Sequence, residues 1–468
     1  MGLAALAAAV PLVAQPPLRP RYAVRRPQTV ATARPLVPTW VSGWRGRSAG
    51  EVDVSRLPGP QSEATVAVNP LNANNVIAGC NDLASPACLA FASPDGGKTW
   101  VSNALPLPAV SSEATDPSIV FDRNGVAYFC YIEVHQSGAR SRILVARSGD
   151  GGATWEADPI RVTEFGAYFE DKTFIGIGPD RLNPARDALF VAWTRLNLDG
   201  SQQLLVTRSA DGGETWTDPA RIDDATAPGN GVIYAQPAVA VDGTVYVVWN
   251  EYGSPNFIRV ARSDDGGATW QPSRVVGEVQ LNLFEGDSGS YLIPAQPQRG
   301  IAASPSIGVD RSVGPRRGSV YVSWSDTASS HDDTDVFIRG SGDGGQTWGP
   351  ILRVNDDRTM RSQFFPWMAV DPVNGAVNLC WYDCRRDRRN RAAHVFLARY
   401  ADGLVARVRN MQVTSQPSNE AKRNADVNNY GDYLGIAAQG GIVYPCWTDS
   451  RTLKKLGEEI WVRRMVFP

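Results

Sequence analysis

The amino-acid sequence predicts an all-β protein folded as a β-propeller, a ring of four-stranded antiparallel blades. Three observations lead to this fold class. Five octapeptides share one pattern, Gly and Pro separate short runs rich in Val, Ile and Tyr, and no long stretch repeats apolar residues at helical spacing. The octapeptides begin at Ser93, Ser148, Ser209, Ser263 and Ser341. Their starts are 54 to 78 residues apart, a spacing typical of successive propeller blades.

Each octapeptide is expected to form a tight turn. In SADGGETW, which begins at Ser209, the carboxylate of Asp211 can accept backbone N–H groups, while Gly212 and Gly213 supply positive φ. Trp216 can then pack between two blades. We therefore interpret the octapeptides as scaffold and assign them no chemistry.

The pattern S-x-D-G-G-x-T-W resembles the Asp-box of sialidases and related β-propellers, a superfamily also described by its BNR repeats. The resemblance implies that each box lies in the hairpin between the third and fourth strands of a blade, away from the active site. The opposite face of the ring would then carry the chemistry.

The number of blades follows from the innermost strands. They recur as TVAVNP, DPSIVFD, KTFIGIGPD, QPAVAVD, SPSIGVD, PWMAVDP and YLGIAA, which predicts seven blades, with a six-bladed, sialidase-like ring as the alternative. The last two units lack the octapeptide, and EIWVRRMVF leaves no room for a fourth strand. We expect residues 50–56 to supply that strand and so close the ring.

The chain divides into three segments. Residues 1–14 form a short apolar run that resembles a signal peptide, residues 15–48 form a linker rich in Pro and Arg, and residues 49–468 form a single propeller domain. The apolar run is too short to cross a bilayer, so we expect a secreted or periplasmic protein without a transmembrane segment.

Charge and cysteine content narrow the possible partners. The formal net charge of −2 provides no global field that would draw the chain to nucleic acid. We expect a monomer that binds a carbohydrate or glycoconjugate and needs no cofactor. A structural Ca²⁺ near Asp332, Asp333 and Asp335 stays open, although the EF-hand spacing is missing. Cys80 and Cys88 bracket a short loop and either pair or stay reduced.

Candidate site residues gather in loops on the face opposite the octapeptides, where an insertion around residues 280–298 is expected to cover the centre. The candidate catalytic residues are Tyr430, Asp432, Glu63, Glu170 and Asp171. The candidate substrate-binding residues are Arg385, Arg451, Asp383, Asp449 and Arg361, and no metal-binding residue is assigned.

Two interpretations of the arginines stay open. Arg385 and Arg451 follow Asp383 and Asp449 at equivalent positions, so both guanidinium groups can converge on a substrate carboxylate. Alternatively, these are structural ion pairs that tie blades together, and Tyr430 is an aromatic cover.

The resemblance to sialidases implies a tyrosine nucleophile activated by a carboxylate, a carboxylic acid as proton donor, and arginines for the substrate. Arg56-Leu57-Pro58 has the letters of the arginine motif with which sialidases begin. The favoured function is a secreted glycoside hydrolase, similar to an exo-α-sialidase, acting on an acidic sugar. The alternatives are a non-catalytic propeller that binds glycan or protein, and a uronate polysaccharide lyase.

Overall fold

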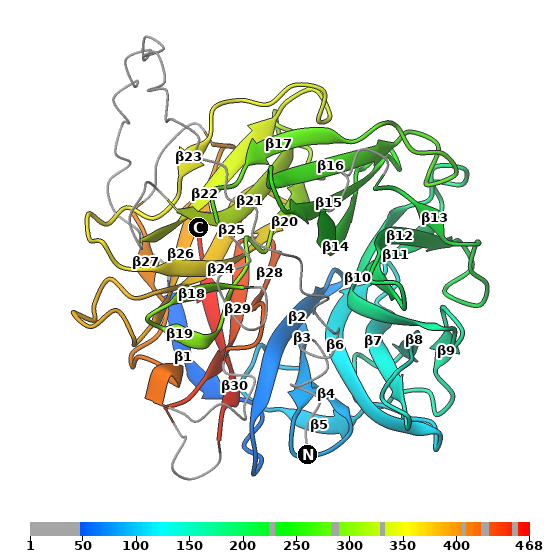
Figure 1. The fold of residues 1–468 in the computed structure, drawn as a ribbon, viewed down its shortest axis with the longest axis horizontal. Coiled ribbons are helices and arrows are strands. Elements are labelled where there is room, and N and C mark those ends of the chain that lie inside the picture. Colours follow the sequence, from blue (N-terminus) through cyan, green and yellow to red (C-terminus); the bar gives the residue numbers. More distant parts are fainter. Residues whose placement is uncertain are drawn as a thin grey trace, which may run out of the picture.

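The computed structural model describes residues 47–468 except six internal segments, and it describes side chains from residue 50 onward. The six segments are residues 224–229, 282–289, 328–332, 405–408, 423–429 and 452–456. Seven four-stranded antiparallel sheets form a ring around a central axis (Figure 1). The structure therefore confirms the all-β fold and seven blades, and the six-bladed alternative is wrong.

The blades follow one another along the chain, with the innermost strand first in each. Blades 1 to 4 are β2 (Gln61–Asn69), β3 (Asn72–Asp82), β4 (Cys88–Ser93), β5 (Val101–Ala104); β6 (Ser111–Phe121), β7 (Ala127–His135), β8 (Ser141–Ser148), β9 (Ile160–Arg161); β10 (Tyr168–Pro179), β11 (Asp187–Asn197), β12 (Gln202–Ser209), β13 (Ala220–Arg221); β14 (Gly231–Val239), β15 (Val245–Tyr252), β16 (Phe257–Ser263), β17 (Arg274–Glu278).

Blades 5 to 7 are β20 (Ser306–Val309), β21 (Val320–Thr327), β22 (Thr334–Ser341), β23 (Leu352–Arg353); β24 (Gln363–Val370), β25 (Val377–Asp383), β26 (His394–Tyr400), β27 (Met411–Gln412); β28 (Gly435–Gln439), β29 (Ile442–Asp449), β30 (Glu459–Val466), β1 (Arg47–Asp53). A hairpin of β18 (Tyr291–Ile293) and β19 (Gln296–Ile301) lies between blades 4 and 5 in sequence. A 3-10 helix, η2 (Glu420–Lys422), precedes blade 7.

The two ends of the propeller meet in blade 7. Strand β1 pairs antiparallel with β30, with Val52 opposite Val462 and Asp53 opposite Trp461. The N-terminal strand is thus the outermost strand of the blade that the C-terminal strands build, which is the closure expected from the sequence. Closing the ring in this way joins the first and last blades.

The octapeptides form the turns expected of them, between the third and fourth strands. In blade 3, Asp211 accepts hydrogen bonds from the Ser209 hydroxyl at 2.8 Å and the Thr215 backbone N–H at 3.0 Å. The Gly213 N–H donates to Ser209 Oγ at 2.9 Å, and its φ of 92° is one that glycine adopts readily. These local bonds explain why the turn recurs with little variation.

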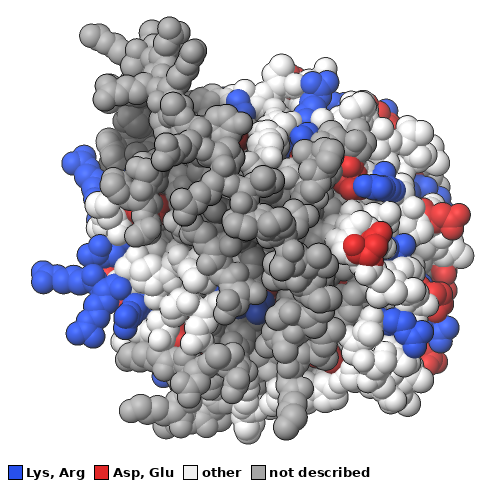
Figure 2. Space-filling view, in the orientation of Figure 1, with Lys and Arg blue, Asp and Glu red and all other residues white. Residues whose placement is uncertain are grey.

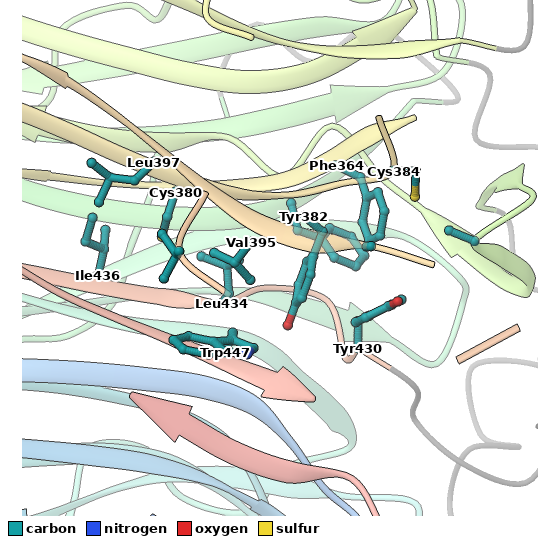
Figure 3. Packing of buried hydrophobic residues seen from close by; sticks show 14 of the residues in the cluster. Phe364, Cys380, Tyr382, Cys384, Val395, Leu397, Tyr430, Leu434, Ile436 and Trp447 are labelled. Carbon is teal, nitrogen blue, oxygen red and sulfur yellow. The ribbon is translucent and has the colours of Figure 1, made fainter. Parts of the chain in front are cut away.

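Hydrophobic clusters fill the spaces between neighbouring blades. Between blades 6 and 7, Phe364, Tyr382 and Leu397 pack against Leu434 and Trp447, and all five side chains are fully buried (Figure 3). Burying a large apolar side chain contributes about 1.5–3 kcal/mol. The core is therefore a series of interfaces between adjacent blades, which holds the central strands in place.

Two smaller expectations are also resolved by the structure. All six cysteines are free and buried, so Cys80 and Cys88 do not form a disulfide. They are diagonal neighbours on adjacent strands, because Cys80 lies opposite Leu89 and Cys88 lies opposite Asn81, and they belong to different hydrophobic clusters. Among the described residues, no helix is long and apolar enough to span a membrane.

Candidate functional site

The innermost strands share an irregularity at the same point. In blades 1, 2, 3, 4 and 6 the pairing with the second strand shifts register, and a residue at this bulge has positive φ. These residues are Glu63 (φ 59°), Asp116 (φ 55°), Lys172 (φ 51°), Tyr234 (φ 62°) and Phe365 (φ 52°). Non-glycine residues in this region cost about 1–3 kcal/mol each, and such strain concentrates at functional sites.

Three of these bulges bring charged side chains together at one end of the central channel. The ammonium group of Lys172 lies 3.7 Å from Glu63 Oε1 and 3.6 Å from Asp116 Oδ1. It also forms a closer ion pair with Asp432, which precedes β28. We call Glu63, Asp116, Asp171, Lys172, Arg299 and Asp432 the central cluster.

The β18–β19 hairpin supplies the second cation of the central cluster. Arg299 Nη2 lies 2.7 Å from Asp432 Oδ2 and 3.6 Å from Glu63 Oε1. The side chain of Arg299 is 27% exposed, compared with 2% for Glu63 and 14% for Asp432. The expected insertion thus reaches this end of the channel through Arg299, and residues 282–289 of it lie outside the described residues.

The carboxyl groups of Glu63 and Asp432 have opposite protonation tendencies. Burial raises the pKa of Glu63 to about 8, against the lowering effect of the Lys172 charge. Burial would also raise the pKa of Asp432, but Arg299 and Lys172 outweigh it and lower that pKa. At neutral pH, Glu63 therefore holds a proton while Asp432 is ionised.

In the other members of the central cluster, burial and the neighbouring charges also shift the pKa in opposite directions. Burial raises the pKa of both Asp116 and Asp171, even though Lys172 opposes it in each case. For Lys172 itself, burial lowers the pKa, but Asp116, Asp432 and Glu63 raise it more, so the group stays charged. Tyr234 is buried beside Arg299 and Asp432, and its pKa is raised by burial.

Aromatic rings lie next to the central cluster along the channel. Phe174, Trp367 and Tyr433 form a triangle with ring centroids 5.2, 5.4 and 5.5 Å apart. The same three residues line a cavity of about 160 Å³ that continues along the innermost strands past Thr65 and Gln236. One pair is edge-to-face and two are tilted, and together the three rings make an apolar wall beside the charged groups.

The structure brings together three of the five candidate catalytic residues. Glu63, Asp171 and Asp432 belong to the central cluster. Tyr430 lies instead between blades 6 and 7, where its ring centroid is 4.4 Å from that of Tyr382 (Figure 3) and its hydroxyl donates to the Ser418 carbonyl at 3.0 Å.

Glu170 lies inside blade 3 rather than in the cluster. Its carboxylate accepts hydrogen bonds from the Trp193 indole at 2.7 Å and from Arg195 Nη2 at 2.5 Å. The guanidinium of Arg195 in turn lies 3.7 Å above the ring of Tyr168. This Trp–acid–Arg unit joins the first two strands of the blade.

The candidates Asp383 with Arg385 and Asp449 with Arg451 belong to two further Trp–acid–Arg units of this kind. Asp383 accepts a bond from the Trp381 indole at 2.9 Å and two from Arg385 at 2.9 and 2.7 Å. Asp449 binds the Trp447 indole at 2.9 Å and Arg451 at 3.0 and 2.7 Å. Arg385 also binds Asp356, whereas Arg451 also binds Glu51, so the two guanidinium groups share no partner.

Arg361 also has a local role in the structure. Its Nε donates to the Asp387 carbonyl at 3.0 Å and its Nη1 to the Met360 carbonyl at 3.2 Å, which joins two loops of blade 6. Among the described residues, no group of three or more His, Cys, Asp or Glu side chains could hold a metal ion. Asp332, part of the calcium option, lies outside the described residues.

Four residues of this site were assigned no catalytic or substrate-binding role from the sequence: Asp116, Lys172, Tyr234 and Arg299. The sequence does contain a signal for three of them. When the blades are aligned on the bulge, Glu63, Asp116, Lys172, Tyr234 and Phe365 occupy one position, two residues before Thr65, Ser118, Phe174, Gln236 and Trp367. Arg299 lies outside the repeat and has no such signal.

A ring of seven antiparallel blades with a charged cluster at one end of its channel defines the class of this protein as a seven-bladed β-propeller. The chain is 27% identical to a sialidase of Micromonospora viridifaciens over an aligned region of 289 residues. The aligned region covers 56% of this chain and 40% of the relative. The resemblance to sialidases is thereby confirmed, and the chain spans less than half the length of this curated relative. No known family model matches the sequence.

Solved structures with a similar fold come from several kinds of protein. A protein of unknown function from Dyadobacter fermentans has a TM-score of 0.48 and 13% identity, covering 90% of this chain and 99% of that one. A Penicillium chrysogenum α-L-arabinanase has a TM-score of 0.48 and 12% identity, with 75% and 98% covered. A Hadza microbial sialidase has a TM-score of 0.46 and 15% identity, with 83% and 73% covered.

Proposed function

We propose that this protein is a glycoside hydrolase whose active site is the central cluster, and that it cleaves a sugar bearing an acidic group. Glu63 would donate a proton to the leaving oxygen, and ionised Asp432 would support the positive charge that develops on the sugar ring. Asp171 is a further carboxyl group within the field of Lys172 and Asp432.

The observation that carries this proposal is the contrast between Glu63 and Asp432. Their carboxylate oxygens lie around the same Arg299 and Lys172 side chains, yet their pKa values are shifted in opposite directions. Titratable groups whose environments push their pKa values apart are the usual arrangement for an acid and a base acting at neutral pH.

The preference for an acidic sugar rests on the two cations. The side chain of Arg299 is more exposed than those of Glu63 and Asp432, and its planar guanidinium group suits a carboxylate. Raised pKa values at Glu63, Asp116 and Asp171 reduce the negative charge that would repel an anion. An incoming carboxylate would then compete with Asp432 for Arg299.

The cellular setting is part of the proposal. We infer that the protein is exported, guided by the segment at residues 1–14, and acts as a monomer on carbohydrate outside the cytoplasm. Mass spectrometry of the mature N-terminus from a secreting host tests export. Light scattering coupled to size-exclusion chromatography tests the monomer.

The decisive experiment measures hydrolysis of 4-methylumbelliferyl conjugates of N-acetylneuraminic acid, a uronic acid and neutral arabinofuranose. Glu63→Gln and Asp432→Asn are each expected to lower kcat about 100-fold or more, because each removes a group that acts in the transition state. Glu214→Gln is the matched control, since Glu214 is an exposed carboxylate paired with Arg147 on another part of the ring.

Other outcomes reassign the protein. Uronate polysaccharides are followed in parallel at the absorbance of the unsaturated product, and a rise there without release of methylumbelliferone would replace hydrolase by lyase. Glycan binding without turnover on any substrate would make the protein a non-catalytic propeller. Equal activity of Glu63→Gln and the control would remove the central cluster from catalysis.

A further inference from the structure

Blade 6 carries an exposed group of arginines on two neighbouring loops. One loop precedes β24 and the other joins β25 to β26. We call the five exposed side chains of these loops the arginine patch: Arg358, Arg386, Arg388, Arg389 and Arg391. Figure 2 shows blue side chains gathered at the left edge of this face with few red ones among them, while the colours at the right edge are mixed.

The arginine patch is not neutralised by its neighbours. Within the part of the chain that the structure describes, none of the five forms an ion pair with a carboxylate. Carboxylates nearby already have partners: Asp356 binds Arg385 at 2.6 Å, and Asp357 Oδ1 accepts from Asn355 at 2.8 Å. The positive charge is therefore available to an external anion.

The loop that carries four of these arginines is held in shape by Asp387. Its carboxylate accepts hydrogen bonds from the backbone N–H groups of Arg389 at 3.0 Å, Arg391 at 2.9 Å and Ala392 at 2.9 Å. These backbone bonds fix the direction of the loop, and the single negative charge of Asp387 is set against the four arginines that surround it in sequence.

A second set of bonds fastens this loop to the one before β24. Asn390 Oδ1 accepts from the Ser362 N–H at 2.8 Å, and Asn390 Nδ2 donates to Ser362 Oγ at 3.0 Å. Arg361 Nε donates to the Asp387 carbonyl at 3.0 Å. The arginines thus project from a preorganised pair of loops, which lowers the entropy lost when they bind a ligand.

We propose that the arginine patch is a second binding surface, which holds an anionic polysaccharide through repeated carboxylate or sulfate groups. The patch lies on the same face as the central cluster, because Asp383 at the start of its loop pairs with Gln363, two residues before the bulge at Phe365. A guanidinium group matches the planar or tetrahedral oxygens of such groups with two parallel hydrogen bonds.

The choice of a glycan among polyanions rests on the proposed function, but the charge distribution supports it independently. The whole chain has a formal charge of −2 despite this patch, so the rest of the molecule is acidic. A broad polyanion such as duplex DNA would meet that acidic remainder, whereas a single polysaccharide chain can follow the patch alone.

The test compares two quadruple variants of the full chain. Arg386→Gln, Arg388→Gln, Arg389→Gln and Arg391→Gln together remove four of the five arginines of the patch. Arg140→Gln, Arg161→Gln, Arg274→Gln and Arg317→Gln together remove the same charge from exposed positions elsewhere on the ring. Fluorescein-labelled polygalacturonate carries carboxylates only, dextran sulfate carries sulfates only, and neutral dextran and duplex DNA complete the set of probes.

Fluorescence anisotropy at low salt should show that the natural protein binds one or both anionic polysaccharides. The affinity should fall about tenfold or more in the patch variant and less than twofold in the control variant. The probe that binds identifies carboxylate or sulfate as the ligand group. Equal weakening in both variants, tighter binding of DNA than of either polysaccharide, or no binding at all would overturn the proposal. Because no turnover is involved, a failure here is separate from a failure of the hydrolase assay.

Discussion

Lys172 and Asp432 form an ion pair at one end of the central channel, although they come from the third and seventh blades. Only 11% of the lysine side chain and 14% of the aspartate side chain are exposed. Glu63 of blade 1 and Asp116 of blade 2 approach the same ammonium group. One lysine therefore links four blades, and its charge balances carboxyl groups that burial would otherwise make costly.

Replacement of Lys172 by Met should destabilise the protein strongly at neutral pH. Removing one partner from a buried ion pair costs about 3–5 kcal/mol, because the remaining charges lose their compensation. The loss should shrink as the pH falls towards 4, because Asp116 and Asp171, whose pKa values are raised by burial, take up protons there. Urea unfolding at several pH values measures it, with Lys98→Met as the control because Lys98 is exposed. A loss independent of pH would show that packing, not charge, explains the effect.

The raised pKa of Glu63 predicts how stability depends on pH. The folded state keeps a proton on Glu63 up to about pH 8, whereas the unfolded chain releases it near the ordinary value of 4.5. Folded protein therefore binds more protons in this window, and the free energy of unfolding should fall with rising pH by up to about 1.4 kcal/mol per unit.

The matching variant is Glu63→Gln, which cannot titrate and still presents a polar group to the Asn81 amide, now 2.6 Å from Glu63 Oε2. Its unfolding free energy should fall less steeply than that of the natural protein between pH 5 and pH 8. Parallel curves for the two proteins would contradict the assigned proton on Glu63.

The fold was predictable because its information is local and repeated. Each octapeptide closes its own turn, as Asp211 and Ser209 do, and the recurring innermost strands are enough to count the blades. Closure by the N-terminal strand followed from counting strands in the last unit. None of these steps requires knowledge of which side chains meet across the ring.

The candidate site depends on contacts between residues of different blades, and the sequence does not show which residues make these contacts. Tyr430 stands in a loop punctuated by glycine, which favours exposure, yet its ring packs against Tyr382 of the neighbouring blade. Lys172 lies in the middle of the central cluster only because the bulges of several blades meet around it. Arg299 arrives from an inserted hairpin whose path no periodic pattern predicts.

The unit of Trp381, Asp383 and Arg385 should contribute to stability more than to substrate binding. Asp383 is fully buried, and Arg385 covers both of its oxygens. We expect Arg385→Gln to lower the unfolding free energy by about 3 kcal/mol and to leave KM within twofold. Arg386→Gln, next in sequence and exposed, should change stability little. A rise in KM at full stability would instead restore Arg385 to the substrate-binding residues.

The octapeptide turns should contribute modestly and without effect on function. Asp211→Ala removes the bonds to the Ser209 hydroxyl, the Thr215 N–H and the Thr215 hydroxyl at 2.5 Å. A loss of about 1–2 kcal/mol in unfolding free energy is expected. Thermal unfolding and glycan binding are measured on the same sample, and weakened binding at intact stability would argue that the turn face contacts the ligand.

The cysteines provide a chemical test of the native packing. Burial raises the pKa of Cys80 and Cys88 well above the ordinary value, and the thiolate is the reactive form. Native protein should therefore react only slowly with a disulfide reagent, whereas denatured protein should release all six thiols, since none is paired. If only four react after denaturation without reductant, Cys80 and Cys88 are the first pair to examine, because their backbones are one register position apart on adjacent strands. Such a result would require a local shift of β3 against β4, since the two side chains now belong to clusters on opposite faces of the sheet.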